Sequence, residues 1–291
     1  MEEYKNFNSG KISWLHCGGN IDIFCIVNNI IELKECLNKY KEYTNNVVVI
    51  GAGSNLLIRD CGFKGLAIKL SGEFQEIKLL EDNKIFAGSA VLLKKISNFA
   101  INNCLIGCEF LDSIPGTTGG GIAMNAGCFG SEIKDILMEC NCLYNNEIIS
   151  FKNKDLNLNY RHSEIPKNAI ILDAVFQLQK GEKEDIANSI KKIKEMQQYR
   201  KENQIMGYTC GSTFSNPISK DGEKLSAWKL IEEVGLRGVV MDGVKFSEKH
   251  CNFLVNTGTA TATSVENLIN LAKTKIKTKF NIDIKTEIKI I

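Results

Sequence analysis

Two glycine-rich stretches contain the residue types best suited to bind a phosphate group. The first is GAGSNLL at residues 51–57, which follows the apolar run VVVI at 47–50. The second covers residues 109–132 and contains IPGTTGG at 114–120 and MNAG at 124–127. Because glycine lacks a Cβ and tolerates positive φ, its backbone N–H groups can approach an anion closely. We therefore predict that residues 115–121 form a diphosphate-binding turn and that both loops contact one elongated ligand.

Three further side chains are suited to acid or electrophilic chemistry. Arg161 lies in YRHS at 160–163, and its planar guanidinium is a permanently charged partner for a carboxylate. Ser212 lies in GSTFSNP at 211–217, which is not the GxSxG elbow of a hydrolase and has no triad partners at a recognisable spacing. Glu287 lies in IKTEIK at 284–289. Taken alone, the three motifs are more typical of a surface ion pair, an ordinary turn and an exposed strand.

The composition excludes several classes of protein. Basic and acidic residues number 36 and 34 and are interspersed, so we expect no nucleic-acid partner. No apolar run reaches the roughly 20 residues that span a bilayer, and the first residues lack signal-peptide features, so we expect no membrane partner and a cytoplasmic location. Eleven cysteines at irregular spacing and three histidines form no zinc pattern. We therefore predict buried thiols and no metal site.

Hydrophobic periodicity predicts a mixed helix and strand fold for the first part of the chain. A strand at 23–27 precedes a helix with a capping box of Asn29 and Glu32, and a buried strand is expected at 47–50. Short strands follow over 66–87 with a turn at 81–83, then a helix marked by Leu92, Ile96 and Phe99, a strand pair around residues 145–146 and a strand at 170–178. The GAG after a strand lacks the rest of the GxGxxG fingerprint, which disfavours a Rossmann fold.

The 291 residues are long enough for two domains, and a helix expected at 184–200 forms the connection into the second. A helix at 225–234 ends at Gly235, and a strand is expected at 253–256. A second helix is expected to start at a capping box of Thr263 and Glu266, before a terminal strand at 282–291. The predicted domains are residues 1–180, with subdomains of about 1–70 and 71–180, and residues 181–291.

Together these motifs resemble the UDP-N-acetylenolpyruvoylglucosamine reductase family, and the resemblance covers nearly all of residues 16–291. It also includes WKLIEEVGLRG at 228–238 and SEKHCNFLVN at 247–256. The resemblance implies an α+β fold, in which an FAD-binding domain of the vanillyl-alcohol-oxidase (PCMH) type with two subdomains precedes a smaller α+β substrate domain. It implies non-covalent FAD and NADPH as cofactors. The implied FAD-binding residues are Gly51, Ala52, Gly53, Ser54, Asn55, Leu56, Pro115, Gly116, Thr117, Thr118, Gly119, Gly120, Asn125, Ala126 and Gly127.

The resemblance also implies a reaction, the NADPH-dependent reduction of the enolpyruvyl ether of a UDP-sugar to UDP-N-acetylmuramate for peptidoglycan. Hydride would come from N5 of the flavin, and Ser212 would donate the proton. Arg161 and Glu287 would stabilise the charge that develops beside the substrate carboxylate. Tyr160 and Asn216 are the implied substrate-binding residues. The short span between Arg161 and Ser212 indicates the shorter type of the family, which lacks an extra tyrosine loop.

This chain departs from the family pattern at several positions. Ser215 stands where Lys or Gln is common, Lys289 replaces an arginine, and residues 204–208 lack the usual prolines and are one residue short. His16 and Cys17 replace a lysine-isoleucine-like pair, although other flavoproteins of this fold use such residues for covalent attachment. Two alternatives stay open: a flavin oxidase or dehydrogenase with another small substrate, and a non-catalytic flavin or UDP-sugar binding protein. We expect a monomer.

Overall fold

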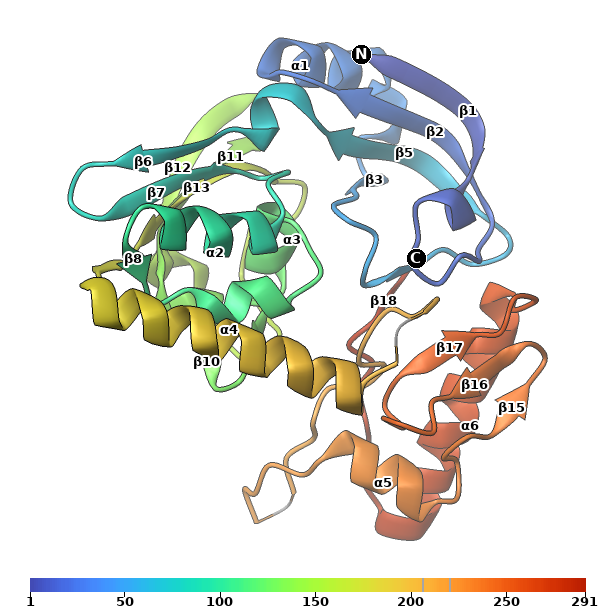
Figure 1. Cartoon of the computed structure of the whole chain (residues 1–291). Helices are drawn as coiled ribbons and strands as arrows, with labels where there is room; N and C mark the ends of the chain where they lie inside the picture. Colours follow the sequence, from blue (N-terminus) through green and yellow to red (C-terminus); the bar gives the residue numbers. More distant parts are fainter. Residues whose placement is uncertain (206, 220) are drawn as a thin grey trace. The chain divides into compact units, whose positions relative to one another are not determined.

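The structure is a computed structural model that describes residues 1–205, 207–219 and 221–291. The chain forms two compact units that interleave along the sequence (Figure 1). Unit 1 consists of Met1–Lys5, Ile23–Ala52 and Gly65–Tyr199, and unit 2 consists of Asn6–Asp22, Gly53–Lys64 and Arg200–Ile291. The sequence boundary between residues 180 and 181 stays a prediction about folding domains, since the compact units follow a different division of the chain.

The first sheet has the strand order β1-β2-β5-β3 and packs against helix α1 (Figure 1). Its strands are β1 (Glu2–Asn8), β2 (Asn20–Val27), β5 (Phe63–Leu70) and β3 (Val47–Val49), and α1 is Ile30–Lys39. The Asn29 side chain caps α1 by accepting from the N–H of Glu32, as predicted. The Glu32 carboxylate accepts from the N–H of Asn28 instead of Asn29, so the capping box is shifted by one residue on that side.

Strand β3 corrects one expectation. It was predicted to be buried, but Val49 is 39% exposed and the strand lies at the edge of its sheet, parallel to β5. Three consecutive valines fit such an edge because β-branched side chains favour extended backbone whether or not both faces are covered. The following Ile50 is buried, so the chain turns inward where the first glycine loop begins.

The second sheet of unit 1 is antiparallel and has the order β12-β11-β13-β7-β6. The predicted turn at 81–83 and the hairpin at Asn145 and Asn146 are both confirmed, and both asparagines have positive φ as a tight hairpin requires. The strands are β6 (Ile77–Leu80), β7 (Lys84–Gly88), β11 (Leu137–Tyr144), β12 (Glu147–Lys152) and β13 (Ile170–Gln177).

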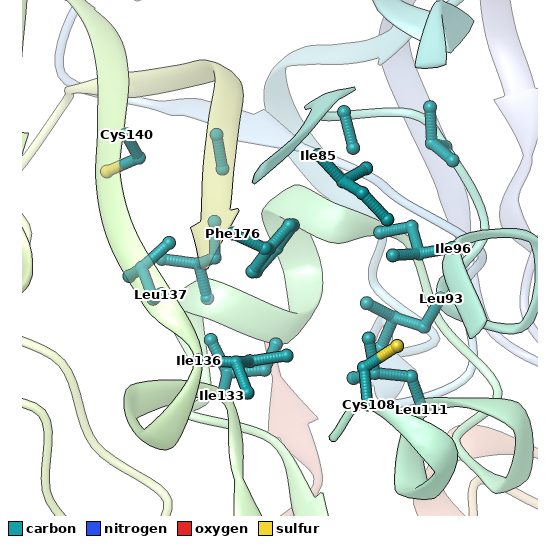
Figure 2. Close-up of a cluster of buried hydrophobic side chains, with 14 of the residues drawn as sticks. Ile85, Leu93, Ile96, Cys108, Leu111, Ile133, Ile136, Leu137, Cys140 and Phe176 are labelled. Atoms are coloured by element: carbon teal, nitrogen blue, oxygen red, sulfur yellow. The ribbon is translucent and has the colours of Figure 1, made fainter. Parts of the chain in front are cut away.

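Helices α2 (Leu93–Asn102) and α3 (Thr118–Ala123) cover this sheet and enclose the largest buried cluster. Figure 2 shows part of the cluster, including Ile85, Leu93, Ile96, Leu137 and Phe176. Short strand pairs complete the unit: β8 (Leu105–Ile106) with β14 (Gln179–Lys180), and β9 (Gly127–Cys128) with β10 (Ser131–Glu132). The glycine-rich stretch is therefore anchored on a rigid core.

Helix α4 (Lys183–Asn203) is attached to unit 1 by two buried carboxylates. Glu109 accepts a hydrogen bond from Ser189 Oγ at 2.7 Å, and Asp112 accepts one from Gln197 Nε2 at 2.7 Å. Both acidic residues immediately precede the predicted diphosphate turn. These contacts hold the loop and the helix in one piece, because burying a carboxylate requires a hydrogen-bond partner.

Unit 2 contains the antiparallel sheet β15-β16-β17 and two helices. The strands are β15 (Val240–Met241), β16 (Val244–Phe246) and β17 (Leu254–Asn256), and the helices are α5 (Ala227–Glu233) and α6 (Ala262–Phe280). Helix α6 begins two residues before the predicted start, because its capping box consists of Thr261 and Ser264. The buried face of α6, which includes Leu268 and Ile276, packs into the unit 2 core as predicted.

The predicted terminal strand at 282–291 is shorter than expected. Only β18 (Lys289–Ile290) is a strand, and it pairs in parallel with β4 (Leu56–Leu57). An isolated antiparallel bridge joins Thr286 to a different segment, at Phe214. The helices within the described ranges include none that combines the length and apolar character needed to span a bilayer.

Candidate active site

The two glycine loops lie against each other within unit 1. A Cβ placed on Gly51 would be only 2.5 Å from Thr117 Oγ1, so the first loop passes directly over the second. Thr117 is the N-cap of α3, and its Oγ1 accepts the N–H of Gly120 at 3.4 Å. The prediction that the loops share one ligand therefore has a geometric basis. Residues 118–121, which were expected in a turn, form the first part of α3.

A third segment, residues 89–93, supports the second loop from behind. The N–H of Gly119 donates to the main-chain oxygen of Ser89 at 2.9 Å, and the N–H of Thr118 donates to that of Val91 at 2.8 Å. A Cβ on Gly119 would lie 3.2 Å from Ser89 Cβ. Glycine at this position is therefore explained by packing within the protein.

Other positions in the loops leave room for a ligand. A Cβ on Gly116 or Gly120 would meet neighbours only at ordinary contact distances of 3.7 and 3.6 Å. Among the residues that the structure describes, the main-chain N–H groups of Gly51, Ala52, Gly116 and Thr117 have no protein acceptor. Unpaired N–H groups on two adjoining loops provide the donors that an anionic group requires. Pro115 is exposed at the start of the second loop.

The MNAG and YRHS segments are joined by three side-chain hydrogen bonds. Asn125 is fully buried and donates from Nδ2 to the main-chain oxygen of Asn159 at 2.9 Å. Ser163 Oγ donates to the main-chain oxygen of Ala123, and Arg161 Nη2 donates to that of Gly127, each at 2.8 Å. Asn125 also binds Glu132 and the N–H of Lys134, so its side chain positions protein segments. Ala126, beside it, donates its N–H to Gly121.

Arg161 occupies the corner of a tight turn in unit 1. Asn159 and His162 exchange main-chain hydrogen bonds at 3.0 Å, and Arg161 has a φ of 57°, which is uncommon for a residue with a side chain. Its guanidinium lies 5.1 Å from the ring centre of Tyr160. The backbone strain, the cation–π contact and the bond to Gly127 together fix the side chain, as a site that binds a carboxylate requires.

An aromatic pair beside this turn escaped the sequence analysis. Phe129 and Tyr199 are 43% and 54% exposed, and their rings form an edge-to-face contact at 5.7 Å. Phe129 follows MNAG after Cys128 and has positive φ. A single exposed aromatic residue carries little information in a sequence, and its partner on α4 lies 70 positions away along the chain.

In unit 2 the Ser212 segment runs beside the Glu287 segment. The N–H of Glu287 donates to the main-chain oxygen of Thr213 at 2.8 Å. Phe214 is held by Asn252, whose side chain accepts from its N–H and donates to its carbonyl. Ser212 itself forms a bridge with Phe253. Two residues predicted to be catalytic are therefore brought together, although they are 75 positions apart along the chain.

The second half of the GAGSNLL loop also belongs to unit 2. A Cβ on Gly53 would lie 1.8 Å from the main-chain oxygen of Ile12, so only glycine fits there. The Asn55 side chain donates to the main-chain oxygen of Glu287 at 3.0 Å. Leu56 is buried in β4, and Ser54 is half-buried. The predicted cofactor loop thus contacts the segment that carries the predicted catalytic glutamate.

The remaining predicted residues have the following surroundings. Asn216 accepts the N–H of Ala227 at 2.9 Å and so holds the start of α5. Ser215 Oγ donates to the main-chain oxygen of Lys285. Met206, in the segment that lacks the family prolines, lies outside the described residues. The predicted residues are divided between the units, with Arg161 and Tyr160 in unit 1 and Ser212, Asn216 and Glu287 in unit 2.

The pKa values of two neighbouring groups, the Cys17 thiol and the Asp60 carboxyl, are shifted in opposite directions. Asp60 was not among the residues selected from the sequence. Burial, together with the nearby Asp60 carboxylate, raises the pKa of the Cys17 thiol to about 11. Burial also raises the pKa of Asp60, but hydrogen bonds from Thr263 and Ala262 at the start of α6 outweigh it and hold that pKa below its ordinary value. No cluster of three or more His, Cys, Asp or Glu side chains suited to a metal ion occurs among the described residues.

The sequence matches two family models. Residues 21–149 match an FAD binding domain, and residues 201–291 match the C-terminal domain of UDP-N-acetylenolpyruvoylglucosamine reductase. These matches confirm the predicted α+β fold, in which an FAD-binding domain is followed by a C-terminal domain of the reductase type.

Individual proteins are similar over the whole chain. UDP-N-acetylenolpyruvoylglucosamine reductases of Rickettsia massiliae and Rickettsia conorii are 38% and 39% identical, with 99% of this chain and 95% of each relative covered. The crystal structure of UDP-N-acetylenolpyruvylglucosamine reductase from Thermus caldophilus superposes with a TM-score of 0.84 at 28% identity, and covers 99% of this chain and 98% of its own.

Proposed function

Since this chain belongs to the UDP-N-acetylenolpyruvoylglucosamine reductase family, we propose that it reduces the enolpyruvyl ether of UDP-N-acetyl-3-O-(1-carboxyvinyl)-glucosamine with NADPH. The product is UDP-N-acetylmuramate, a precursor of peptidoglycan. The observation that supports this assignment most strongly is the grouping of the Ser212 and Glu287 segments with the GAGSNLL loop in unit 2. Glu287 donates its N–H to Thr213, the neighbour of Ser212, at 2.8 Å, and its main-chain oxygen accepts from Asn55 at 3.0 Å. A cytoplasmic location, the short type of the family and a monomeric state belong to the same proposal.

The residues present fit FAD. Gly51, Ala52, Gly116 and Thr117 offer main-chain N–H donors without protein acceptors among the described residues, and Gly116 and Gly120 leave space that a side chain would fill. These groups would hold the diphosphate. When bound, FAD supplies the hydride-transfer chemistry between NADPH and the enolpyruvyl group. The high pKa of Cys17 and its burial support non-covalent binding, because a protonated, enclosed thiol is a poor nucleophile.

Arg161 binds and orients the substrate carboxylate in this mechanism. Its guanidinium is already fixed by Gly127 and by the Tyr160 ring, so little side-chain entropy is lost when the carboxylate arrives. As hydride adds to the terminal methylene, negative charge develops on the carboxylate and the adjacent carbon. A permanently charged, planar partner stabilises that charge at any working pH.

Ser212 delivers a proton to the adjacent carbon, and Glu287 assists in stabilising the charge, either as a protonated carboxyl that donates a hydrogen bond or as a partner that positions a donor. A serine is a weak acid in water, so the step requires a site without bulk water and a strongly basic carbon. The main-chain bond between Glu287 and Thr213 fixes the glutamate next to Ser212.

Turnover of NADPH tests the proposal against its two rivals. The purified protein should oxidise NADPH rapidly only when the enolpyruvyl UDP-sugar is present, with one lactyl ether formed per NADPH. Oxidation that proceeds with oxygen alone or with another small substrate would indicate a different flavin enzyme. Binding of flavin or UDP-sugar without any turnover would indicate a non-catalytic binding protein.

A further inference from the structure

Asn55 stands at the point where two paired strands separate. Strands β4 and β18 are parallel, with Lys289 opposite Leu56, and the N–H of Lys289 donates to the main-chain oxygen of Asn55 at 3.1 Å. In a parallel ladder the next bond toward the N-termini would run from the N–H of Asn55 to the carbonyl of Glu287. The strands diverge there, and that main-chain bond is not made.

The side chain of Asn55 replaces the missing bond. Its Nδ2 donates to the main-chain oxygen of Glu287 at 3.0 Å, while the N–H of Glu287 donates to Thr213 at 2.8 Å. The backbone of Glu287 is therefore held on both sides. Among the described residues the main-chain N–H of Asn55 has no acceptor, although it lies in the loop that offers N–H groups to an anion.

We propose that Asn55 is a positioning residue for Glu287 and not only a flavin ligand. The side-chain amide of Asn55 fixes the backbone of Glu287. Because this bond takes the place of the main-chain bond, the main-chain N–H of Asn55 stays available to the cofactor diphosphate. One residue thus joins the cofactor loop to the segment that carries Glu287. The role requires a short side chain with an N–H donor, which Asp and Ala lack. The inference rests on the proposed function of Glu287.

The experiment separates positioning from cofactor binding. Asn55→Ala and the isosteric Asn55→Asp are compared with Asn103→Ala, a control in which Nδ2 also donates to a main-chain oxygen, that of Phe99, at 2.8 Å. FAD affinity is measured by titrating apoprotein, and the two half-reactions are followed by stopped flow.

Asn55→Ala, which keeps the main-chain N–H, should bind FAD and react with NADPH nearly as the wild type does. Asn55→Asp adds a negative charge beside the proposed diphosphate, so it should also weaken FAD binding. Reoxidation by the enolpyruvyl sugar should slow by about 10- to 100-fold, the effect of a misplaced catalytic group. Asn103→Ala should not slow it.

A double-mutant cycle with Glu287→Gln identifies the residue through which Asn55 acts. If Asn55 works through Glu287, Asn55→Ala should slow reoxidation by less than about twofold when Gln already occupies position 287. Additive effects of the two substitutions on reoxidation would overturn this proposal, and so would a reoxidation defect that saturating FAD removes. In either case, normal turnover by the wild-type protein would still uphold the proposed function. A wild-type protein that NADPH reduces but the enolpyruvyl sugar does not reoxidise would overturn both.

Discussion

Arg161 donates from Nη2 to the main-chain oxygen of Gly127 at 2.8 Å, which links the arginine of YRHS to the glycine of MNAG. The same two segments share the bonds of Asn125 and Ser163. The loop predicted to bind cofactor and the turn predicted to bind substrate are thus one structural piece of unit 1. A change in either segment should therefore affect the other.

The first prediction concerns the shape of the Arg161 side chain. Arg161→Lys keeps the positive charge and the same backbone conformation but loses the planar fork and the bond to Gly127. Turnover should fall by about 10- to 100-fold, since a hydrogen bond to a charged group contributes roughly 1.5–3 kcal/mol. Steady-state kinetics measures the change. Arg59→Lys, in an exposed ion pair with Glu266, is the control and should stay within about twofold because such pairs contribute little. If Arg161→Lys were as active as the wild type, Arg161 would not bind the substrate carboxylate and would be an ordinary surface residue.

The second prediction concerns flavin attachment. The purified protein should be yellow and should release all of its flavin into the supernatant on acid denaturation, because the Cys17 thiol is buried and protonated at neutral pH. Cys17→Ser should retain flavin equally well. Absorbance of the precipitated polypeptide near the flavin bands measures the outcome. Flavin that stays with the wild-type pellet would mean covalent attachment at His16 or Cys17.

The third prediction distinguishes two glycines of the second loop. Gly120→Ala has room in the protein, so it should leave the stability of the apoprotein unchanged but weaken FAD binding by about tenfold or more, because the new methyl group faces the proposed ligand. Gly119→Val should also lower the thermal stability, because its Cβ meets Ser89. Titration of FAD and thermal unfolding separate the two effects. Gly207→Ala, where a Cβ has open space, is the control. Normal FAD affinity in Gly120→Ala would contradict the loop assignment.

The fourth prediction concerns the pH dependence of stability. Asp60 accepts the N–H groups of Ala262 and Thr263 at 2.9 and 2.8 Å, and its folded pKa is lowered. Its contribution is therefore complete above the unfolded value of about 3.9 and is lost as the pH falls through the lower folded pKa. Asp60→Ala should lower the unfolding free energy by about 0.5–2 kcal/mol at neutral pH, the range for replacing a helix cap by alanine. Urea unfolding from pH 7 to pH 3 should show this difference shrinking; a constant difference would contradict the assignment.

Sequence patterns predicted the correct structure for features that depend only on residues close together in the chain. The Asn145 and Asn146 hairpin, the Asn29 cap and the buried face of α6 were all predicted from patterns a few residues long. The start of α6 was misplaced by two residues because Thr261 and Thr263 are both good caps. The choice between them is made by Asp60, which binds the first turn from 202 and 203 positions away along the chain.

The candidate site could be predicted only in part, because it also depends on contacts between residues that are far apart in the chain. The glycine loops have a composition that is visible in the sequence, but the contact between Gly51 and Thr117 and the bond from Asn55 to Glu287 join distant segments. Periodicity says nothing about such pairs. The resemblance to a family selected Ser212 and Glu287, and the structure adds which main-chain groups hold them in place.

The half-reactions of Ser212→Ala test the central claim most directly. If Ser212 only protonates the substrate-derived carbon, the variant should be bleached by NADPH at a near-normal rate in a stopped-flow experiment. Its reoxidation by the enolpyruvyl UDP-sugar should slow by about 10²- to 10⁴-fold, the effect of losing a positioned acid. Ser212→Cys should recover part of that rate, because a thiol can donate a proton from the same position. Equal slowing of both half-reactions in Ser212→Ala, or none in either, would contradict the account.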